Sequence, residues 1–184
     1  MKTTTIVTRG VIVILAIALS SGCEVGVNPL LFDGSPVEAS FPINTSSASF
    51  ASEVNTDLGE VLKDISDEFD SVNVFNITLQ IENTGNMVTT TSFDGSAAFN
   101  DSVLVSFTGI PLSRLLKEQS MFRITGVTVN KRGILYLKRA INTALRNPGT
   151  PSIAKFTIAG NSSQTPVHIT PIVRVYTQVF TKKK

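Results

Sequence analysis

The sequence predicts an α+β domain built on an antiparallel β-sheet or sandwich, with an N-terminal amphipathic helix and a second helix near residues 134–146. Between residues 71 and 107, apolar and polar residues alternate, as in strands with one face in the core. Two other segments carry apolar residues at helical spacing. Helices and strands do not alternate strictly along the chain, which argues against a doubly wound parallel sheet. The pattern leaves open whether the sheet is covered by a second sheet or by helices.

The first expected helix covers residues 50–70. Apolar residues recur there at spacings of three and four, which places them on one stripe of a helix. A second, acidic stripe consists of Glu53, Asp57, Glu60, Asp64 and Asp67. Like charges at this spacing repel one another in an isolated helix. We therefore expect basic side chains from elsewhere in the chain to compensate them.

Strands are expected on both sides of several turn signals. The first begins near residue 71, and one of its faces is expected to hold Phe75, Ile77, Leu79 and Ile81. A turn is expected at residues 83–86 and another at Asp94-Gly95, since both contain residues that favour turns. The strand after the second turn is expected to place Val103, Val105 and Phe107 on one face. Short helical structure at 111–120 and strands at 121–129, 153–160 and 167–180 complete the expected fold.

The second helix carries the opposite charge from the first. Its apolar residues keep helical spacing over residues 134–145, and the sequence Asn-Pro-Gly after residue 146 stops it. The basic residues in and just before it include Lys131, Arg132, Lys138 and Arg139. We expect this helix or its neighbours to face the acidic helix.

The N-terminus has the pattern of a secretory signal peptide. Lys2 and Arg9 are followed by nine apolar residues, Val11 to Leu19, and then by small residues. This apolar run is shorter than the roughly 20 residues that a membrane-spanning helix needs. A removed signal peptide over residues 1–22 is therefore expected.

The residues that follow hold the only cysteine of the chain. The sequence L-S-S-G-C, residues 19–23, resembles the lipobox of bacterial lipoproteins, although the position three before Cys23 is Ser20 where that family usually has leucine. The resemblance implies that Cys23 is lipidated and becomes the first residue of the mature protein. It also implies a location in the cell envelope, and Glu24 in place of aspartate weakly favours the outer membrane over the inner membrane.

Composition of the remaining 162 residues favours a tether and one domain. Residues 23–49 are rich in serine, proline, asparagine and threonine, and we expect them to form a lipid-anchored tether. Residues 50–184 form the expected globular domain. With the signal removed, basic and acidic residues are equal in number, which argues against a nucleic-acid partner.

The charges are nevertheless separated along the chain. Residues 23–101 contain 13 acids and one base, whereas residues 102–184 contain 13 bases and one acid. Two explanations fit this separation. The favoured one is that the two halves interleave in one fold and neutralise each other. The alternative is a dipolar surface that binds an envelope protein, a second copy of the chain or anionic lipid head groups.

Sequence motifs do not indicate catalysis. One histidine and one cysteine are too few for the usual zinc sites. The segment D-I-S-D-E-F-D lacks the loop glycine and the ligand spacing of an EF-hand, so no calcium site or other cofactor is expected. No nucleophile elbow or phosphate-binding loop is present.

These observations favour a membrane-anchored lipoprotein with a non-catalytic binding or assembly domain. One alternative is an envelope carrier of an apolar ligand. Another is a hydrolase that uses carboxylates, for which Asp94, Asp101 and His168 would be the residues to test.

Overall fold

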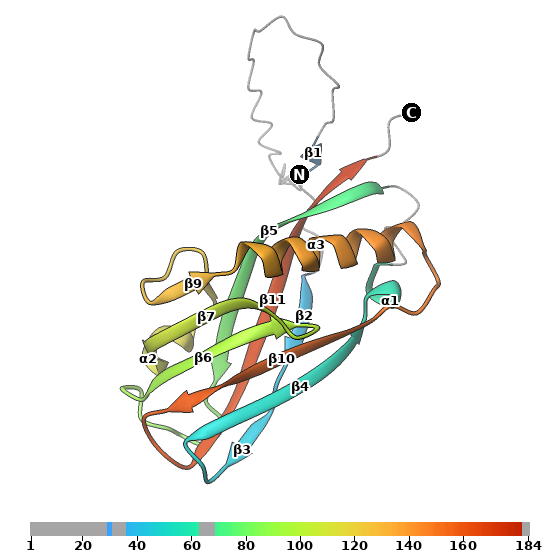
Figure 1. The fold of residues 1–184 in the computed structure, drawn as a ribbon. Coiled ribbons are helices and arrows are strands. Elements are labelled where there is room, and N and C mark those ends of the chain that lie inside the picture. Colours follow the sequence, from blue (N-terminus) through green and yellow to red (C-terminus); the bar gives the residue numbers. More distant parts are fainter. Residues whose placement is uncertain (1–28, 31–35, 63–68, 182–184) are drawn as a thin grey trace, which may run out of the picture.

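The structure, a computed structural model, describes residues 29–30, 36–62 and 69–181 (Figure 1). Two antiparallel sheets face each other and share one apolar core, to which both contribute buried side chains. The expectation of antiparallel sheets is confirmed, and the second cover is another sheet rather than a layer of helices. Within the described ranges, no helix is both long enough and apolar enough to cross a membrane.

The first sheet is built around the last strand of the chain. Its path is β1 (Pro29–Leu30), β11 (Val167–Thr181), β5 (Phe69–Glu82) and β8 (Gln119–Ser120). Two further strands, β2 (Val37–Ser40) and β3 (Ile43–Thr45), also pair with β11. On this side of β5, the short strand β8 pairs only with Thr78 and Leu79. The N-terminal part of β5 therefore extends past the end of β8.

The second sheet mixes strands from both halves of the chain. Its order is β4 (Ser49–Asp57), β10 (Ile153–Ser162), β6 (Ser92–Phe99), β7 (Ser102–Pro111) and β9 (Val127–Val129). The C-terminal strand β10 therefore lies between two strands of the N-terminal half. This order interleaves the acidic and basic halves of the sequence, as the favoured explanation of the charge separation requires.

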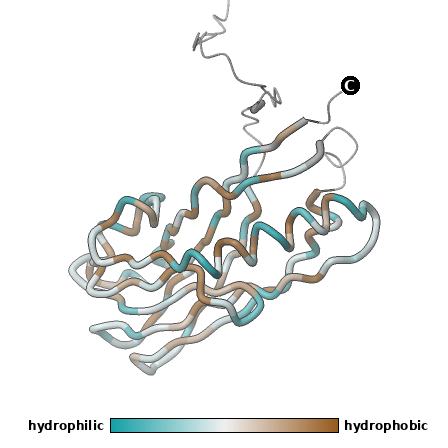
Figure 2. Tube along the Cα trace, turned by 45° about the horizontal axis from the view of Figure 1, so that its top comes forward, coloured by the Kyte–Doolittle hydropathy of each residue, from teal (hydrophilic) through white to brown (hydrophobic). Residues whose placement is uncertain are grey.

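Three helices accompany the sheets in the described part of the chain. They are α1 (Leu58–Leu62), α2 (Leu112–Leu115) and α3 (Lys131–Arg146). The long helix α3 runs along one side of the molecule and contacts strands of both sheets (Figure 1). Hydrophobic and hydrophilic residues alternate along it (Figure 2), and it buries Leu137, Ile141 and Leu145. The second predicted helix is thus confirmed, with a start three residues earlier.

The first predicted helix is not formed where its start is described. Residues 49–57 are strand β4, which pairs with β10 over nine residues, and only Leu58–Leu62 is helical. Phe50, Val54 and Leu58 are four residues apart, and a spacing of four satisfies a period of two as well as a helix. The backbone hydrogen bonds with β10 along all of β4 stabilise the strand over the helix. Residues 63–68, including Asp64 and Asp67, lie outside the described residues.

The expected tether is also too long. Its second half forms β2 and β3, and Val37, Ala39, Phe41 and Ile43 are each at most 6% exposed in the core. These four residues alternate with polar or proline residues, so a period-two signal was present in the sequence. The composition, rich in serine and proline, instead favoured a tether. The domain begins at or before Val37 rather than at Phe50.

A β-bulge reverses one prediction in β5. Ile77, Leu79 and Ile81 are buried as predicted, but Phe75 is 49% exposed. Tyr176 pairs with Asn76 and Thr177 pairs with Val74, so Phe75 is an extra residue in β5. An extra residue shifts the alternation, and Val74 takes the core position instead.

The turn predicted at Asp94-Gly95 is wrong. Both residues lie inside β6, and the chain turns instead at Asn100 and Asp101, whose φ angles are 44° and 64°. Gly95 is needed for close approach: a Cβ there would lie 2.4 Å from the carbonyl oxygen of Ala159 in β10. The glycine thus permits close strand packing rather than a turn.

Candidate functional site

An apolar groove opens between the edges of the two sheets. It lies between β9 and the part of β5 beyond β8, with α3 along one wall. The lining consists of Asn73, Val74, Phe122, Val129, Lys131, Ile134, Leu135 and Lys138. Its volume is about 480 Å³, within the range of roughly 300–1,000 Å³ that is common for small-molecule sites. Phe122 and Leu135 are 40% and 46% exposed, so apolar walls of the groove face solvent.

The N-terminal end of α3 is set directly against β7. Asn130 caps the helix, since its Oδ1 accepts hydrogen bonds from the amides of Arg132 at 3.0 Å and Gly133 at 3.2 Å. A Cβ at Gly133 would lie 2.0 Å from the carbonyl oxygen of Val103. Only glycine permits this distance, and the close contact places Lys131 and Ile134 at the groove.

Farther along, α3 is joined to the edge of β5 by a side chain. The amide of Val72 donates to Oδ1 of Asn142 at 2.8 Å, and Nδ2 of Asn142 donates to the carbonyl of Val72 at 2.9 Å. The Asn142 side chain thereby substitutes for a neighbouring strand. On the other side of the groove, the amide of Met121 donates to the carbonyl of Ile77 at 2.8 Å.

The described charged groups of the groove are basic. Lys131 and Lys138 are two helical turns apart, a separation of about 10 Å along the helix axis. The two residues between them that line the groove, Ile134 and Leu135, are apolar. No carboxylate is among the lining residues, and the sequence of α3 contains none. Arg132 and Arg139 lie on the same helix, exposed and outside the lining.

The predicted acidic residues do not form one stripe. Glu53 is exposed on β4, and Glu60 is exposed on α1. Asp57 ends β4, where its Oδ1 accepts from the amides of Ser152 and Gly59, each at 2.9 Å. The Ser152 amide is the main cause of a lowered pKa at Asp57. The helix α1 lies near the C-terminal end of α3 (Figure 1), away from Lys131 at its start.

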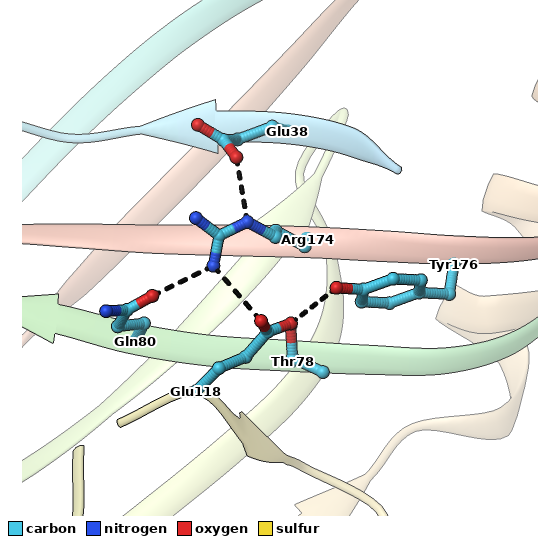
Figure 3. A network of polar contacts seen from close by, with 6 residues as sticks. All are labelled: Glu38, Thr78, Gln80, Glu118, Arg174 and Tyr176. Atoms are coloured by element: carbon cyan, nitrogen blue, oxygen red, sulfur yellow. Dashed lines mark hydrogen bonds and ion pairs between the residues drawn. The ribbon is translucent and has the colours of Figure 1, made fainter. Parts of the chain in front are cut away.

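The only acid of the C-terminal half, Glu118, lies in a polar network on the outer face of the first sheet (Figure 3). Its Oε1 accepts hydrogen bonds from Thr78 at 2.5 Å and Tyr176 at 2.7 Å. Arg174 lies 3.5 Å from its Oε2 and also pairs with Glu38 at 2.8 Å. Glu38 and Arg174 belong to opposite halves of the chain, as do Asp101 and Lys155, which pair at 2.7 Å. The two halves thus neutralise each other in part.

These contacts predict a pH dependence for Glu118→Gln. The Thr78 hydroxyl, followed by Tyr176 and Arg174, holds the pKa of Glu118 below its ordinary value of 4.5. The carboxylate therefore contributes stability above pH 4.5, and this contribution is lost as the pH falls through the lowered pKa. Because Glu118 is a third exposed, we expect the substitution to cost only about 1 kcal/mol at pH 7.

Urea unfolding between pH 7 and pH 3 measures this effect. The difference in unfolding free energy between wild type and Glu118→Gln should shrink below pH 4.5. Thr78→Val removes the main hydroxyl donor and should reproduce part of the change. A difference that stays constant over the whole pH range would contradict the prediction.

The residues proposed for a carboxylate hydrolase are not brought together. Asp94 lies in β6, where its Oδ1 accepts from the amide of Gly109 at 2.6 Å. Asp101 lies in the turn after β6, so roughly 20 Å of strand separates it from Asp94. Glycosidase carboxylates are only about 5–9.5 Å apart. His168 lies near the start of β11 and packs against Gly85. A Cβ at Gly85 would lie 2.2 Å from the Cβ of His168.

Sequence reasoning missed most of the groove. Of its lining residues, the sequence predicts only Lys131 and Lys138 as interaction residues. One signal was available at residues 134–137, Ile-Leu-Tyr-Leu, because four consecutive apolar residues cannot all lie on one face of a helix. Leu135 and Tyr136 are accordingly 46% and 44% exposed. Nothing in the local sequence indicates that Phe122 and Val129 lie next to them.

Known proteins add little to this description. No family model matches the chain, and no curated protein matches it either. Among solved structures, it is similar to a chain of Desmodium yellow mottle tymovirus at 11% identity. The similarity covers 91% of this chain and 94% of that chain, with a TM-score of 0.29. Values this low support no conclusion about fold or function.

Proposed function

We propose that this protein is an exported lipoprotein of the bacterial cell envelope whose β-domain is a binding module rather than an enzyme. The groove between β9, β5 and α3 is the observation that carries the binding role. It combines a concave apolar surface with a few charged groups, which is the usual composition of a ligand site. The anchor is supported by the signal-like N-terminus and the L-S-S-G-C sequence.

The roles of the acidic side chains also support binding over catalysis. Asp57 accepts backbone hydrogen bonds, while Asp101 and Glu118 pair with basic residues. These groups stabilise the fold at separate places. The groove, in contrast, presents apolar side chains and lysines to solvent, which suits recognition of a molecule by shape and charge.

Lipidation at Cys23 would hold the domain close to a membrane. Cys23 lies outside the described residues, but Val37, the start of β2, follows it by only 14 positions in the chain. A chain of that length reaches at most about 50 Å when fully extended. The first paired residue, Pro29 of β1, is only six residues away, which allows about 20 Å. Glu24 favours the outer membrane as the location.

Intact mass spectrometry of the protein isolated from membranes tests the anchor. The expected mass begins at Cys23 and includes added acyl chains, and Cys23→Ser should abolish both the lipid and the membrane association. Ser21→Ala keeps a small residue before the cysteine and should remain lipidated. An unlipidated wild-type protein would disprove the anchor.

A further inference from the structure

We infer that the groove binds a single acyl chain with an anionic head group, a class of amphiphile that includes fatty acids. The inference rests on the proposed binding role and gives it a ligand class. It does not depend on lipidation of Cys23. It goes beyond that role by specifying two parts of the ligand. The apolar lining indicates an acyl chain, and the lysines indicate an anionic head group.

The apolar half follows from the lining. Five of its eight residues are apolar: Val74, Phe122, Val129, Ile134 and Leu135. They come from β5, the turn after β8, β9 and α3, so an apolar chain lying in the open groove would be contacted from more than one side. Burying a linear chain here would also remove the exposed surfaces of Phe122 and Leu135 from water.

The anionic half follows from the charges. Lys131 and Lys138 flank Ile134 and Leu135, so each end of the helical wall carries an ammonium group. Lysine stems cover apolar surface while their charged ends remain in water, which suits a head group at the mouth of the groove. A second hollow of about 240 Å³ shares Phe122 and is lined by Arg123, which adds another base nearby. With no carboxylate in either lining, a cationic head group would find no opposite charge among the lining residues.

The geometry argues against an added peptide strand. Strand addition needs a run of free backbone groups along a sheet edge. At β5 this edge is already bonded by Asn142 at Val72 and by Met121 at Ile77. Only four residues lie between these two positions, which is too short for a stable ladder.

Calorimetric titration of the full chain carrying Cys23→Ser tests the inference without an attached lipid. Decanoate, laurate and myristate are added below their critical micelle concentrations. We expect affinity to rise about two- to fourfold per added methylene until the groove is filled. Dodecyltrimethylammonium has the chain length of laurate and the opposite charge, and it should bind at least about tenfold more weakly.

Substitutions on α3 locate the site. Leu135→Asp places a carboxylate on the exposed apolar wall and should weaken laurate binding by at least about tenfold. Lys138→Gln should weaken it severalfold, whereas Arg139→Gln removes the same charge from the adjacent residue outside the lining and should not. Thermal unfolding of each variant verifies that it remains folded.

Several results would overturn the inference. Laurate that does not bind, equal affinity for the cationic amphiphile, or equal effects of Lys138→Gln and Arg139→Gln would each do so. Binding to anionic phosphatidylglycerol vesicles without binding of monomeric laurate would indicate bilayer docking instead. None of these results bears on Cys23, so a failure of the ligand class is distinguishable from a failure of the anchor.

Discussion

Phe99→Ala should lower the free energy of unfolding by about 3–5 kcal/mol. Phe99 is fully buried at the end of β6, with ring centroids 5.3 Å from Phe156 in β10 and 5.7 Å from Tyr136 in α3. Its ring thus joins the second sheet to the helix that walls the groove. Truncation removes apolar contacts on both sides and leaves a cavity that the rigid sheet cannot fill by collapsing.

Phe75→Ala is the matched control, because the same side chain is removed from a different environment. Phe75 is 49% exposed and contacts the Tyr176 ring at a centroid distance of 6.1 Å. We expect a cost of about 1 kcal/mol or less. Urea unfolding followed by circular dichroism measures both variants. Equal costs would mean that Phe75 lies in the core, as strict alternation predicts, and would contradict the bulge in β5.

Gly133→Ala should destabilise the protein by about 1–3 kcal/mol. The direction is opposite to ordinary helix propensity, which favours alanine over glycine by roughly 1 kcal/mol inside a helix. The reason is the carbonyl oxygen of Val103, which would lie 2.0 Å from the new Cβ. Backbone atoms cannot rotate away as a flexible side chain would, so α3 must move from β7 and give up packing around Leu137.

Thr143→Ala serves as the control for propensity alone. Thr143 is exposed on the same helix, and alanine there should leave stability unchanged or raise it by a few tenths of a kcal/mol. Displacement of α3 should also widen the groove, so Gly133→Ala should weaken laurate binding while Thr143→Ala should not. A Gly133→Ala protein as stable as wild type would show that α3 does not approach β7 this closely.

Both experiments concern the position of α3, on which the proposed binding role depends. The helix contacts β5 of the first sheet and β6 and β7 of the second sheet. Asn130 starts it, Gly133 lets it approach β7, and Asn142 bonds it to β5. These three residues hold the helical wall of the groove at a fixed distance from Val74 and Val129. The binding surface therefore depends on the position of α3 against β5 and β7.

Several elements could be predicted because their signals are local. The helix α3 is recognisable from helical periodicity and a stop at Asn147-Pro148-Gly149, and its basic residues are read directly from the sequence. The strands β10 and β11 follow from the alternation of apolar residues. The signal peptide and lipidation of Cys23 are local patterns of the same kind, and they remain predictions.

Other features were decided by contacts between segments far apart in the chain. Residues 50–57 satisfy both a helical and a strand period, and pairing with β10, about 100 residues later, selects the strand. Asp94-Gly95 has turn composition, yet β10 approaches it too closely for any side chain at Gly95. The bulge at Phe75 depends on the register with β11.

The groove belongs to this second group. Val74, Phe122, Val129 and Leu135 come from β5, the turn after β8, β9 and α3, and none of them belongs to a sequence motif. Local preferences act over a few residues, so the amino-acid sequence alone determined the helix α3, the alternating strands and the charge of each segment. The choice between competing periods, the direction of individual side chains and the meeting of two sheet edges beside α3 were decided only in the tertiary structure, because long-range pairing and core packing outweigh local preferences that differ by about 1 kcal/mol.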